Sequence, residues 1–587
     1  MTVEKLITDH IDIWSSALQT RSTAGRGSSG KIDLYGIKKL RELILELAVR
    51  GKLVPQDPND EPASELLKRI AAEKAELVKQ GKIKKQKPLP EISEDEKPFE
   101  LPEGWEWVRL GFITNYGECD KAEPTDTDAD TWIVELEDIE KSTSRLLNRV
   151  KFSERPFKSS KNKFNKNDVL YGKLRPYLDK VLVADDSGVC TTEIIPIKVY
   201  GNILPGYLRL LLKSPRFIAY ANESTHGMNL PRLGTDKAIN AVVELTAIAE
   251  QVRIVNKVDE LMSLCDQLEQ QSLTSLEAHQ QLVDTLLATL TDSQNEKELA
   301  ENWSRINQHF DTLFTTEASI DALKQTILQL AVMGKLVPQD PNDEPASELL
   351  KRIEQEKAQM VKNGKIKKQK PLPPISDEEK PFELPQGWEW CRLGDLAHNS
   401  EAGWSPQCEA SPRVDDNWGV LKISSVTWSE FNPNENKALP KHLEPKIEYE
   451  VKARDFLISR ANTADLVARS VVVPDSPPNH LMLSDKIIRF QFSKLVDVNY
   501  INLVNNSKYS RTYYSDVAGG TSSSMKNVSR IQVSSLLVAL PSYNEQLNIV
   551  EKVRNLTLLC EHLKSHLQSA QQTQLHLANA LTDAALN

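Results

Sequence analysis

Residues 157–180 include the residue types that bind a phosphate backbone. Seven cationic side chains stand there against two carboxylates, and aromatic side chains are interleaved with them. Lysine and arginine neutralise phosphates and release counterions, and arginine can also bond the edge of guanine through two nitrogens. The pattern favours contact with nucleic acid; its alternative is a solvated charged loop whose aromatic residues belong to a core. The candidate binding residues are Lys158, Lys161, Lys163, Lys166, Lys173, Arg175 and Tyr177.

A second group of cations lies in the last third of the chain. Residues 455–460 resemble residues 168–173, because each is an apolar, strand-like run that ends in one cation. Small polar residues fill positions 519–524 and, in a comparable place, 224–229. Such residues suit close approach of a backbone to phosphate, and a plain loop is the alternative interpretation. The candidates in this part are Arg460, Lys508, Arg511, Tyr513 and Lys526.

Catalytic motifs are absent from the sequence. Residues 25–31 imitate a phosphate-binding loop, but Ile32 stands where serine or threonine must reach magnesium. The Asn/Asp-Pro-Pro-Tyr/Phe motif, which clamps a flipped adenine in amino-methyltransferases, does not occur. Residues 377–380 resemble a fragment of a nuclease active-site motif. We interpret them as charged residues exposed to solvent. We therefore predict a protein with no catalytic residues and no cofactor of its own.

The length of the chain predicts several domains. At 587 residues it is too long for one core and should divide into roughly three to five. The net charge of −10 is opposite in sign to that of most nucleic-acid-binding domains, so the cations must be concentrated locally. No apolar run is long enough to cross a bilayer, and the six cysteines have neither metal-ligand nor disulfide spacing. We predict a cytoplasmic protein with no membrane partner and no metal site.

An internal repeat organises the chain. Residues 47–111 match residues 330–394 without a gap, and only 11 of the 65 aligned positions differ. A weaker repeat relates the region from Glu250 to the region from Glu545. The two segments between the repeated blocks, 112–249 and 395–544, look almost unrelated to each other. We call the repeated blocks the frame and these segments the first and second inserts. Two copies cannot form a stacked array, so this is a duplication.

Hydrophobic spacing predicts that the frame is helical. In the two regions that the weaker repeat relates, apolar residues alternate steps of four and three, which is the period of a coiled coil. They are Ile254, Val258, Leu261, Cys265, Leu268, Leu282 and Leu286, then Ile549, Val553, Leu556, Cys560, Leu563, Leu567, Leu577 and Leu581. Ser272, Ser275 and His279 interrupt the first of these stripes. Antiparallel pairing of two such helices would relate the inserts by a pseudo-twofold axis. A further repeated helix is predicted to start near Pro62 and Pro345, where proline suits a first turn.

The inserts are predicted to be mixed, mostly β domains, because short strand-like runs are broken by Pro, Gly, Asn and Asp clusters. The predicted fold class is α+β, with two such domains joined by long helices that form an antiparallel coiled coil. We expect an N-terminal helical region and linker at 1–99 and a first insert domain at 100–245. A central helical region and linker at 246–382, a second insert domain at 383–541 and a C-terminal helix at 542–587 complete the chain.

With this architecture, the chain resembles the specificity (S) subunit of Type I restriction–modification enzymes over essentially its full length. The resemblance rests on the Leu-Ala-Val-x-Gly-Lys-Leu-Val-Pro-Gln blocks at 47–56 and 330–339 and on Leu-Pro-x-Gly-Trp at 101–105 and 384–388. The run 254–268 is similar to the branch with a long central conserved region. One departure is that Leu245 is followed by Thr246, where such sequences usually have Leu-Pro-Pro. The exit turn of the first insert is therefore expected to be less rigid.

The resemblance implies sequence-specific binding of double-stranded DNA. Each insert would be a target-recognition domain that reads one half of a bipartite, asymmetric target, and the helical pair would set the gap. The implied partners are two modification (methyltransferase) subunits and two restriction (nuclease–translocase) subunits. Those partners would hold S-adenosylmethionine, ATP and Mg²⁺ and carry out adenine methylation and DNA cleavage. Base-contacting residues vary with the target in this family, so the candidates above rest on this chain's own pattern.

Two other functions are open at this point. A fused restriction–methylation enzyme would show activity or bound cofactor in the isolated chain. A coiled-coil scaffold without a DNA role would bind duplex DNA weakly and without salt dependence, since no phosphates would be neutralised.

Overall fold

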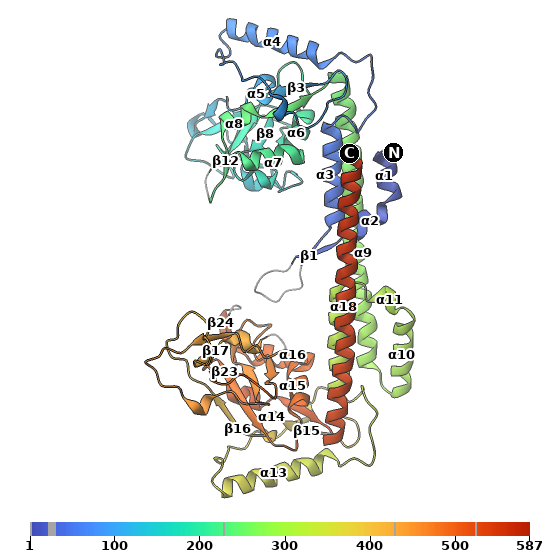
Figure 1. The fold of residues 1–587 in the computed structure, drawn as a ribbon, viewed down its shortest axis with the longest axis vertical. Coiled ribbons are helices and arrows are strands. Elements are labelled where there is room, and N and C mark those ends of the chain that lie inside the picture. The colour runs from blue at the N-terminus through green and yellow to red at the C-terminus, as the bar shows by residue number, and fades with distance from the viewer. Residues whose placement is uncertain (1–2, 22–30, 227–228, 428–429, 523–524, 587) are drawn as a thin grey trace. The chain divides into compact units, whose positions relative to one another are not determined.

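The computed structural model describes residues 3–21, 31–226, 229–427, 430–522 and 525–586. The chain divides into two compact units (Figure 1). Unit 1 consists of Met1–Thr20, Ile32–Thr274 and Gln571–Asn587, and unit 2 consists of Arg21–Lys31 and Ser275–Ala570. Each unit therefore contains one copy of the frame, one insert, and a part of each of the two longest helices. Residues 25–30 of the run that imitates a phosphate-binding loop lie outside the described residues, and Lys31 begins β2.

The frame of unit 1 is helical, as predicted. Its elements are α1 (Val3–Asp9), α2 (Ile11–Ser16), α3 (Tyr35–Val49), α4 (Ala63–Lys79), the first part of α9 (Ile248–Asp292) and the last part of α18 (Tyr543–Leu586), with β1 (Gln19–Arg21) and β2 (Lys31–Asp33) before α3. Pro62 caps the start of α4, and Gly81 follows its end with a φ of +69°, which glycine adopts without strain. The predicted linker helix is confirmed.

In unit 1, α3 contacts both α9 and α18, which run antiparallel to each other. The Tyr35 hydroxyl donates to Asn579 Oδ1 at 2.7 Å, and further along α3's direction Lys52 Nζ donates to the Leu586 carbonyl at 2.7 Å. α3 and α18 are therefore parallel. Arg41 of α3 pairs with Asp266 at 2.5 Å, and Gln56, which follows α3, donates to Glu250 at 2.7 Å, so α3 runs antiparallel to α9. Figure 1 shows α3 beside both long helices.

Unit 2 repeats this arrangement with the other copy of the frame. Its helices are α10 (Glu296–Gln308), α11 (Phe310–Leu313), α12 (Glu317–Val332) and α13 (Ala346–Lys362). Lys564 of α18 pairs with Asp321 of α12 at 2.9 Å. Lys335 donates to the Thr291 carbonyl at 2.6 Å, as Lys52 does to Leu586 in unit 1. α9 and α18 again run antiparallel and share one core through Val283, Leu287, Leu290, Ile549, Val553 and Cys560.

The predicted coiled-coil stripe is correct near the start of each helix and wrong further along. Ile254 and Ile549 are fully buried, but Leu282 is 51% exposed and Leu577 is 42% exposed. The neighbouring residues, Val283 and Ala578, are buried instead. A repeat of 3.5 residues drifts by about 20° per heptad relative to an α-helix of 3.6 residues per turn. Over the stretch from Ile254 this drift moves the buried face later by nearly one residue.

The two inserts have the mixed, mostly β composition that was predicted. In the first insert domain, 100–245, β3 (Glu106–Arg109) pairs with β14 (Val242–Leu245), so the two ends of the domain are joined. The other strands are β4 (Lys121–Ala122), β5 (Trp132–Val134), β6 (Val150–Lys151), β7 (Lys161–Phe164), β8 (Val169–Gly172), β9 (Val181–Val183), β10 (Gly188–Cys190), β11 (Ile194–Ile197), β12 (Thr225–His226) and β13 (Arg232–Leu233). Its helices are α5 (Leu110–Ile113), α6 (Pro205–Lys213), α7 (Pro215–Glu223) and α8 (Thr235–Asn240).

The second insert is closed in the same way, by β15 (Glu389–Arg392) and β26 (Leu537–Leu540). Its other strands are β16 (Ala397–Ala402), β17 (Gly419–Leu421), β18 (Asn436–Ala438), β19 (Phe456–Ser459), β20 (Ala461–Asn462), β21 (Ser470–Val472), β22 (Leu481–Met482), β23 (Ile487–Phe492), β24 (Gly519–Ser522) and β25 (Met525–Asn527). Its helices are α14 (Leu393–Leu396), α15 (Val498–Asn506), α16 (Lys508–Val517) and α17 (Arg530–Ser534).

The inserts share the arrangement of their central strands, although their sequences look unrelated and their sheets differ in size. β8 lies between β11 and β9, and β19 lies between β23 and β21, in each case antiparallel to both neighbours. Each insert also has one parallel pair, β5 with β10 and β17 with β22. Two consecutive helices follow, and then a short hairpin. The likeness of residues 168–173 to residues 455–460 is thus a structural equivalence.

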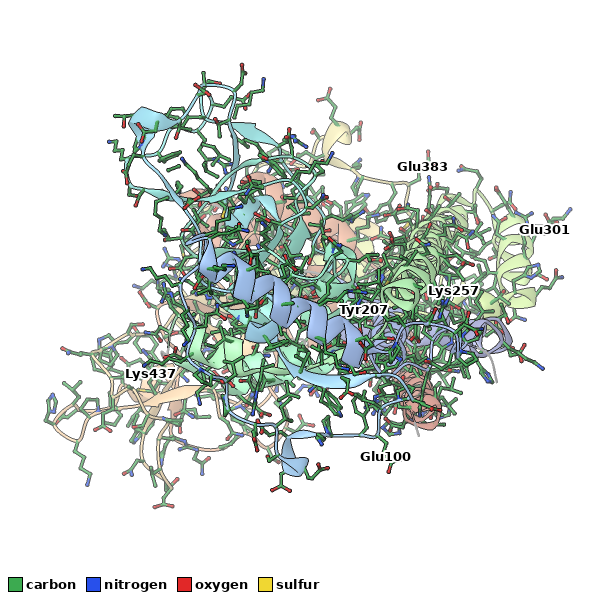
Figure 2. All side chains as sticks on the ribbon, turned by 90° about the horizontal axis from the view of Figure 1, so that it is seen from above. Glu100, Tyr207, Lys257, Glu301, Glu383 and Lys437 are labelled. Atoms are coloured by element: carbon green, nitrogen blue, oxygen red, sulfur yellow. The ribbon has the colours of Figure 1, made fainter. Side chains whose placement is uncertain are left out.

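The helix after the sheets packs against the frame in unit 1. Gly206 of α6 lies so close to Val255 of α9 that an added Cβ would come within 3.1 Å of its side chain. Tyr207 is fully buried and donates from its hydroxyl to the Glu244 carbonyl at 3.3 Å. Figure 2 shows the side chains of this region, with Tyr207 of α6 and Lys257 of α9 labelled. The frame therefore provides a rigid base for the insert.

Candidate nucleic-acid interface

The end of β8 presents a cluster of candidate residues, of which Arg175 and Tyr177 are exposed and Lys173 is half-buried. Lys173 follows the last residue of the strand, and the next turn contains Arg175 and the 3-10 helix η4 (Pro176–Leu178). Arg175 is exposed, and the Tyr177 side chain is 53% exposed although it is aromatic. Neither Lys173 nor Arg175 has a side-chain partner among the described residues. Arg175 and Tyr177 are therefore available to a ligand, and the half-buried Lys173 has no competing side-chain hydrogen bond among the described residues.

A hairpin lies against this turn. The Leu233 backbone nitrogen donates to the Lys173 carbonyl at 3.0 Å, and the Arg175 backbone nitrogen donates to the Pro231 carbonyl at 2.7 Å. The hairpin adds one cation that the sequence pattern did not single out, Arg232, which pairs with Glu193 at 3.0 Å. The small polar run 224–229 overlaps this hairpin in sequence, and its residues 227–228 lie outside the described part of the chain. The only sequence signal for Arg232 is its place after that run.

The earlier cations of the first insert lie on and beside β7, in a different sheet. Lys161 is paired with Glu135, and its side chain is only 12% exposed. Lys163 lines a cavity of about 500 Å³ together with Asp126, Asp128 and Asp130. Lys158 and Lys166 are exposed, with no side-chain partner among the described residues. The basic segment is therefore not one continuous patch, and Lys161 is occupied within the fold.

The second insert has the same construction around Arg460. This residue is exposed, it follows β19, and its carbonyl accepts from the Val528 backbone nitrogen at 2.9 Å, next to the hairpin of β24 and β25. Lys526 of β25 bonds the Gly520 carbonyl at 2.9 Å. Residues 523–524 of the small polar run lie outside the described residues. A strand-end cation beside a hairpin is thus common to both inserts.

Two candidates of the second insert have partners inside the fold. Arg511 donates to the Val467 carbonyl at 2.7 Å and lies over the Tyr514 ring, and burial lowers the pKa of this guanidinium to about 10. The Tyr513 hydroxyl donates to the Gln532 carbonyl at 2.7 Å. Lys508, at the start of α16, is exposed. The sequence pattern could not separate Arg511 from Lys508, because their partners come from distant residues.

The repeated linkers are held against the inserts by buried arginines. Arg109 donates to Glu96 at 2.6 Å and to the Pro90 and Glu91 carbonyls, and this bonding lowers the pKa of Glu96 to about 2. Arg392 makes the equivalent ion pair with Glu379 at 3.0 Å. Each linker is therefore fastened to its own insert.

The described residues contain no cluster of three or more His, Cys, Asp or Glu side chains that could hold a metal ion. All six cysteines are free. In the part of the chain that the structure describes, no helix is both long enough and apolar enough to cross a membrane.

The chain is similar to two Type I restriction enzyme specificity subunits of Escherichia coli over its full length. The EcoEI specificity subunit is 55% identical over 597 residues, with 100% of each chain covered. The EcoAI specificity subunit is 50% identical over 607 residues, again with 100% of each covered. The EcoDI specificity subunit, also from Escherichia coli, is 26% identical over 254 residues, which are 43% of this chain and 52% of that protein. No protein-family model matches the sequence.

Solved structures are more distant. A chain from a study of complex assembly and conformational transition of the type I R-M system is 16% identical, with a TM-score of 0.49 over 84% of this chain and 99% of that one. The HsdS subunit from Thermoanaerobacter tengcongensis is also 16% identical, with a TM-score of 0.40 over 83% and 98%. Identity of 50% or more along the whole length carries the assignment. The chain belongs to the family of Type I restriction enzyme specificity subunits.

Proposed function

We propose that the two inserts are target-recognition domains, at 100–245 and 383–541, and that each reads one half of a bipartite, asymmetric site on double-stranded DNA. As a specificity subunit the chain determines DNA target recognition, and catalysis and its cofactors, S-adenosylmethionine and ATP, belong to partner subunits. The helical regions at 1–99, 246–382 and 542–587 form the scaffold. A fused restriction–methylation enzyme would need a segment of this chain for a catalytic domain. The specificity-subunit relatives align with the entire chain, so no such segment remains.

One observation carries this proposal: in both inserts a cation with no side-chain hydrogen bond among the described residues follows the same central strand, beside a hairpin. Lys173 and Arg460 occupy equivalent positions after β8 and β19, and the hairpin strand bonds the carbonyl of each. The surrounding sequences differ while the frames are nearly identical. A constant scaffold that presents two different surfaces suits the reading of two different half-sites. A coiled-coil scaffold without a DNA role would not need such divergence.

The reading surface of the first domain is Lys173, Arg175 and Tyr177, with Lys158, Lys163 and Lys166 as phosphate contacts. That of the second domain is Arg460, Lys508 and Lys526. Base-edge contacts specify sequence, whereas phosphate contacts set position and affinity. The assembled complex is proposed to contain two modification and two restriction subunits, the latter requiring Mg²⁺, and to act in the cytoplasm.

Exchange of the first insert tests the proposal. Residues 112–249 are replaced by the corresponding segment of a relative with a different target, and methylated sites are mapped in cells that contain the partner subunits. One half of the methylated motif should change and the other half should stay the same. A change in both halves, or in neither, would show that the inserts are not independent readers.

A further inference from the structure

We propose that Lys213, in the last turn of α6, fixes the shape of the turn at 173–180 through Asp179 and is thereby a positioning residue for half-site recognition. The inference rests on the proposed function, because it assigns Lys213 to the loop that presents Lys173, Arg175 and Tyr177. Lys213 itself does not reach the surface, since only 6% of the residue is exposed. It acts through the backbone of the turn.

The ammonium group of Lys213 gathers three acceptors from two loops. It donates to Asp179 Oδ2 at 2.6 Å, to the Ser142 carbonyl at 2.8 Å and to Ser144 Oγ at 2.8 Å. Ser144 Oγ donates in turn to the Asp179 carbonyl at 2.7 Å. All three hydrogens of the ammonium group are therefore used, and both the side chain and the backbone of Asp179 are fastened.

The turn needs such fastening because its backbone is strained. Arg175 has a φ of +53° and Asp179 a φ of +49°. Both lie in the left-handed backbone region that residues other than glycine rarely adopt. The Ser142 and Ser144 backbones also have positive φ values, +66° and +59°. Conformations of this kind persist only where the surrounding structure determines them. The strained residues here are the candidate reader Arg175 and its support Asp179.

Burial makes the two charges depend on each other. Desolvation raises the pKa of Asp179 to about 6, against the attraction of Lys213, and desolvation also lowers the pKa of Lys213. Oδ1 of Asp179 is buried with no hydrogen-bond partner among the described residues. A buried ion pair of this kind adds little stability over an apolar replacement, although loss of one partner is costly. The pair is therefore better explained by the shape it imposes than by stability.

In the second insert, uncharged groups in the last turn of the corresponding helix make similar contacts, from Asn505 as well as from the position equivalent to Lys213. Ser214 and Ser507 cap α7 and α16 in the same way, so Lys213 corresponds to Asn506. Asn505 Nδ2 donates to the carbonyl of Ala468, whose φ is +57°, and Asn506 Nδ2 donates to the Ser470 carbonyl at 3.0 Å. In both inserts the last turn of the first helix thus holds the turn that follows the central strand.

The test separates shape from stability. Lys213→Met, Asp179→Asn, the double variant and Ser144→Gly are assembled with the partner subunits, and binding to duplexes with single base changes in either half is measured. Ser144→Gly keeps the positive φ and strands no charge. The control, Lys237→Met, removes an exposed charge from the same domain. Thermal unfolding is recorded for each.

Each single variant should lose about tenfold or more in discrimination at the first half-site and less than about twofold at the second, where tenfold corresponds to about 1.4 kcal/mol. The double variant should regain thermal stability, because no unpaired charge remains, without regaining discrimination. Ser144→Gly should lose discrimination while it stays folded. Lys237→Met should match the unchanged chain.

Discrimination that returns together with stability in the double variant, or that stays intact in Ser144→Gly, would overturn the inference. Failure of the proposed function has a different signature. If Lys173→Ala with Arg175→Ala leaves first-half discrimination unchanged, the turn does not read DNA and both proposals fall. If the double substitution of Lys173 and Arg175 reduces base discrimination at the first half-site while the Lys213 variants do not, only the role of Lys213 is rejected.

Discussion

The indole nitrogen of Trp105 donates to Oε2 of Glu250 at 2.9 Å and so joins the start of the first insert domain, 100–245, to the start of α9. Glu250 also accepts from Gln56 Nε2 at 2.7 Å. In unit 2, Trp388 donates to Glu545 at 3.0 Å. The joint between frame and insert is therefore a duplicated, buried polar cluster.

Trp105→Phe should destabilise unit 1, because it removes a donor from a buried carboxylate. A buried acceptor that loses a partner costs about 1–3 kcal/mol. The matched variant Trp388→Phe should have a similar effect in unit 2. Urea unfolding monitored through the remaining tryptophans measures both. Unchanged midpoints would mean that the joint does not depend on this hydrogen bond.

Simultaneous replacement of Lys158, Lys163 and Lys166 by Gln should flatten the dependence of DNA affinity on salt. Each lost phosphate contact on duplex DNA lowers the log–log slope by about 0.9. Lys161→Gln is the matched control, since Lys161 is already paired with Glu135; it should leave the slope unaltered. Titration of the assembled complex between low and moderate salt measures the slope. An unaltered slope in the triple variant would place the phosphate contacts elsewhere.

Arg175→Ala should relax base choice in one half of the target and leave the salt slope nearly unaffected. A good base-edge contact discriminates by about 1–3 kcal/mol. Arg460→Ala is the counterpart in the second domain and should relax the other half. Mapping of methylated sites in cells with each variant reads both outcomes. Relaxation of the same half by both variants would contradict the assignment of one half-site to each domain.

The clamp between Arg109 and Glu96 should make the first linker sensitive to acid. The pKa of Glu96 is lowered to about 2 in the folded chain by the bond from Arg109 and by the Ser93 backbone, from an ordinary value of 4.5. A carboxyl with a lowered folded pKa contributes stability above pH 4.5, and this contribution is lost as the pH falls from 4.5 toward 2. Glu96→Gln should therefore reduce the pH dependence of unfolding in that window. Identical pH profiles for the two chains would argue against the clamp.

Much of the architecture follows from the residues alone. Near-identical blocks at 47–111 and 330–394 must bury the same faces, so the duplication of the frame and its linker helix could be predicted from the sequence. The structural equivalence of the two runs that end in Lys173 and Arg460 could also be predicted. An apolar strand followed by a cation is a pattern that neighbouring residues alone define. Local patterns of this kind depend only on neighbouring residues, so tertiary packing does not alter the elements that they predict.

Only the tertiary structure decided which cations remain available and which face of each long helix is buried. Lys161 and Lys166 look alike in sequence, yet Glu135 reaches Lys161 through the packing of distant strands. Leu282 lies at the position that the coiled-coil spacing predicts to be buried, yet it is exposed. A small angular drift accumulates along the helix, so that Val283 faces the core instead. The sequence by itself determined the repeated elements and their order, since short-range spacing specifies them. Ion pairing and helix phase depend on residues brought together from far apart, and those were settled only by the fold.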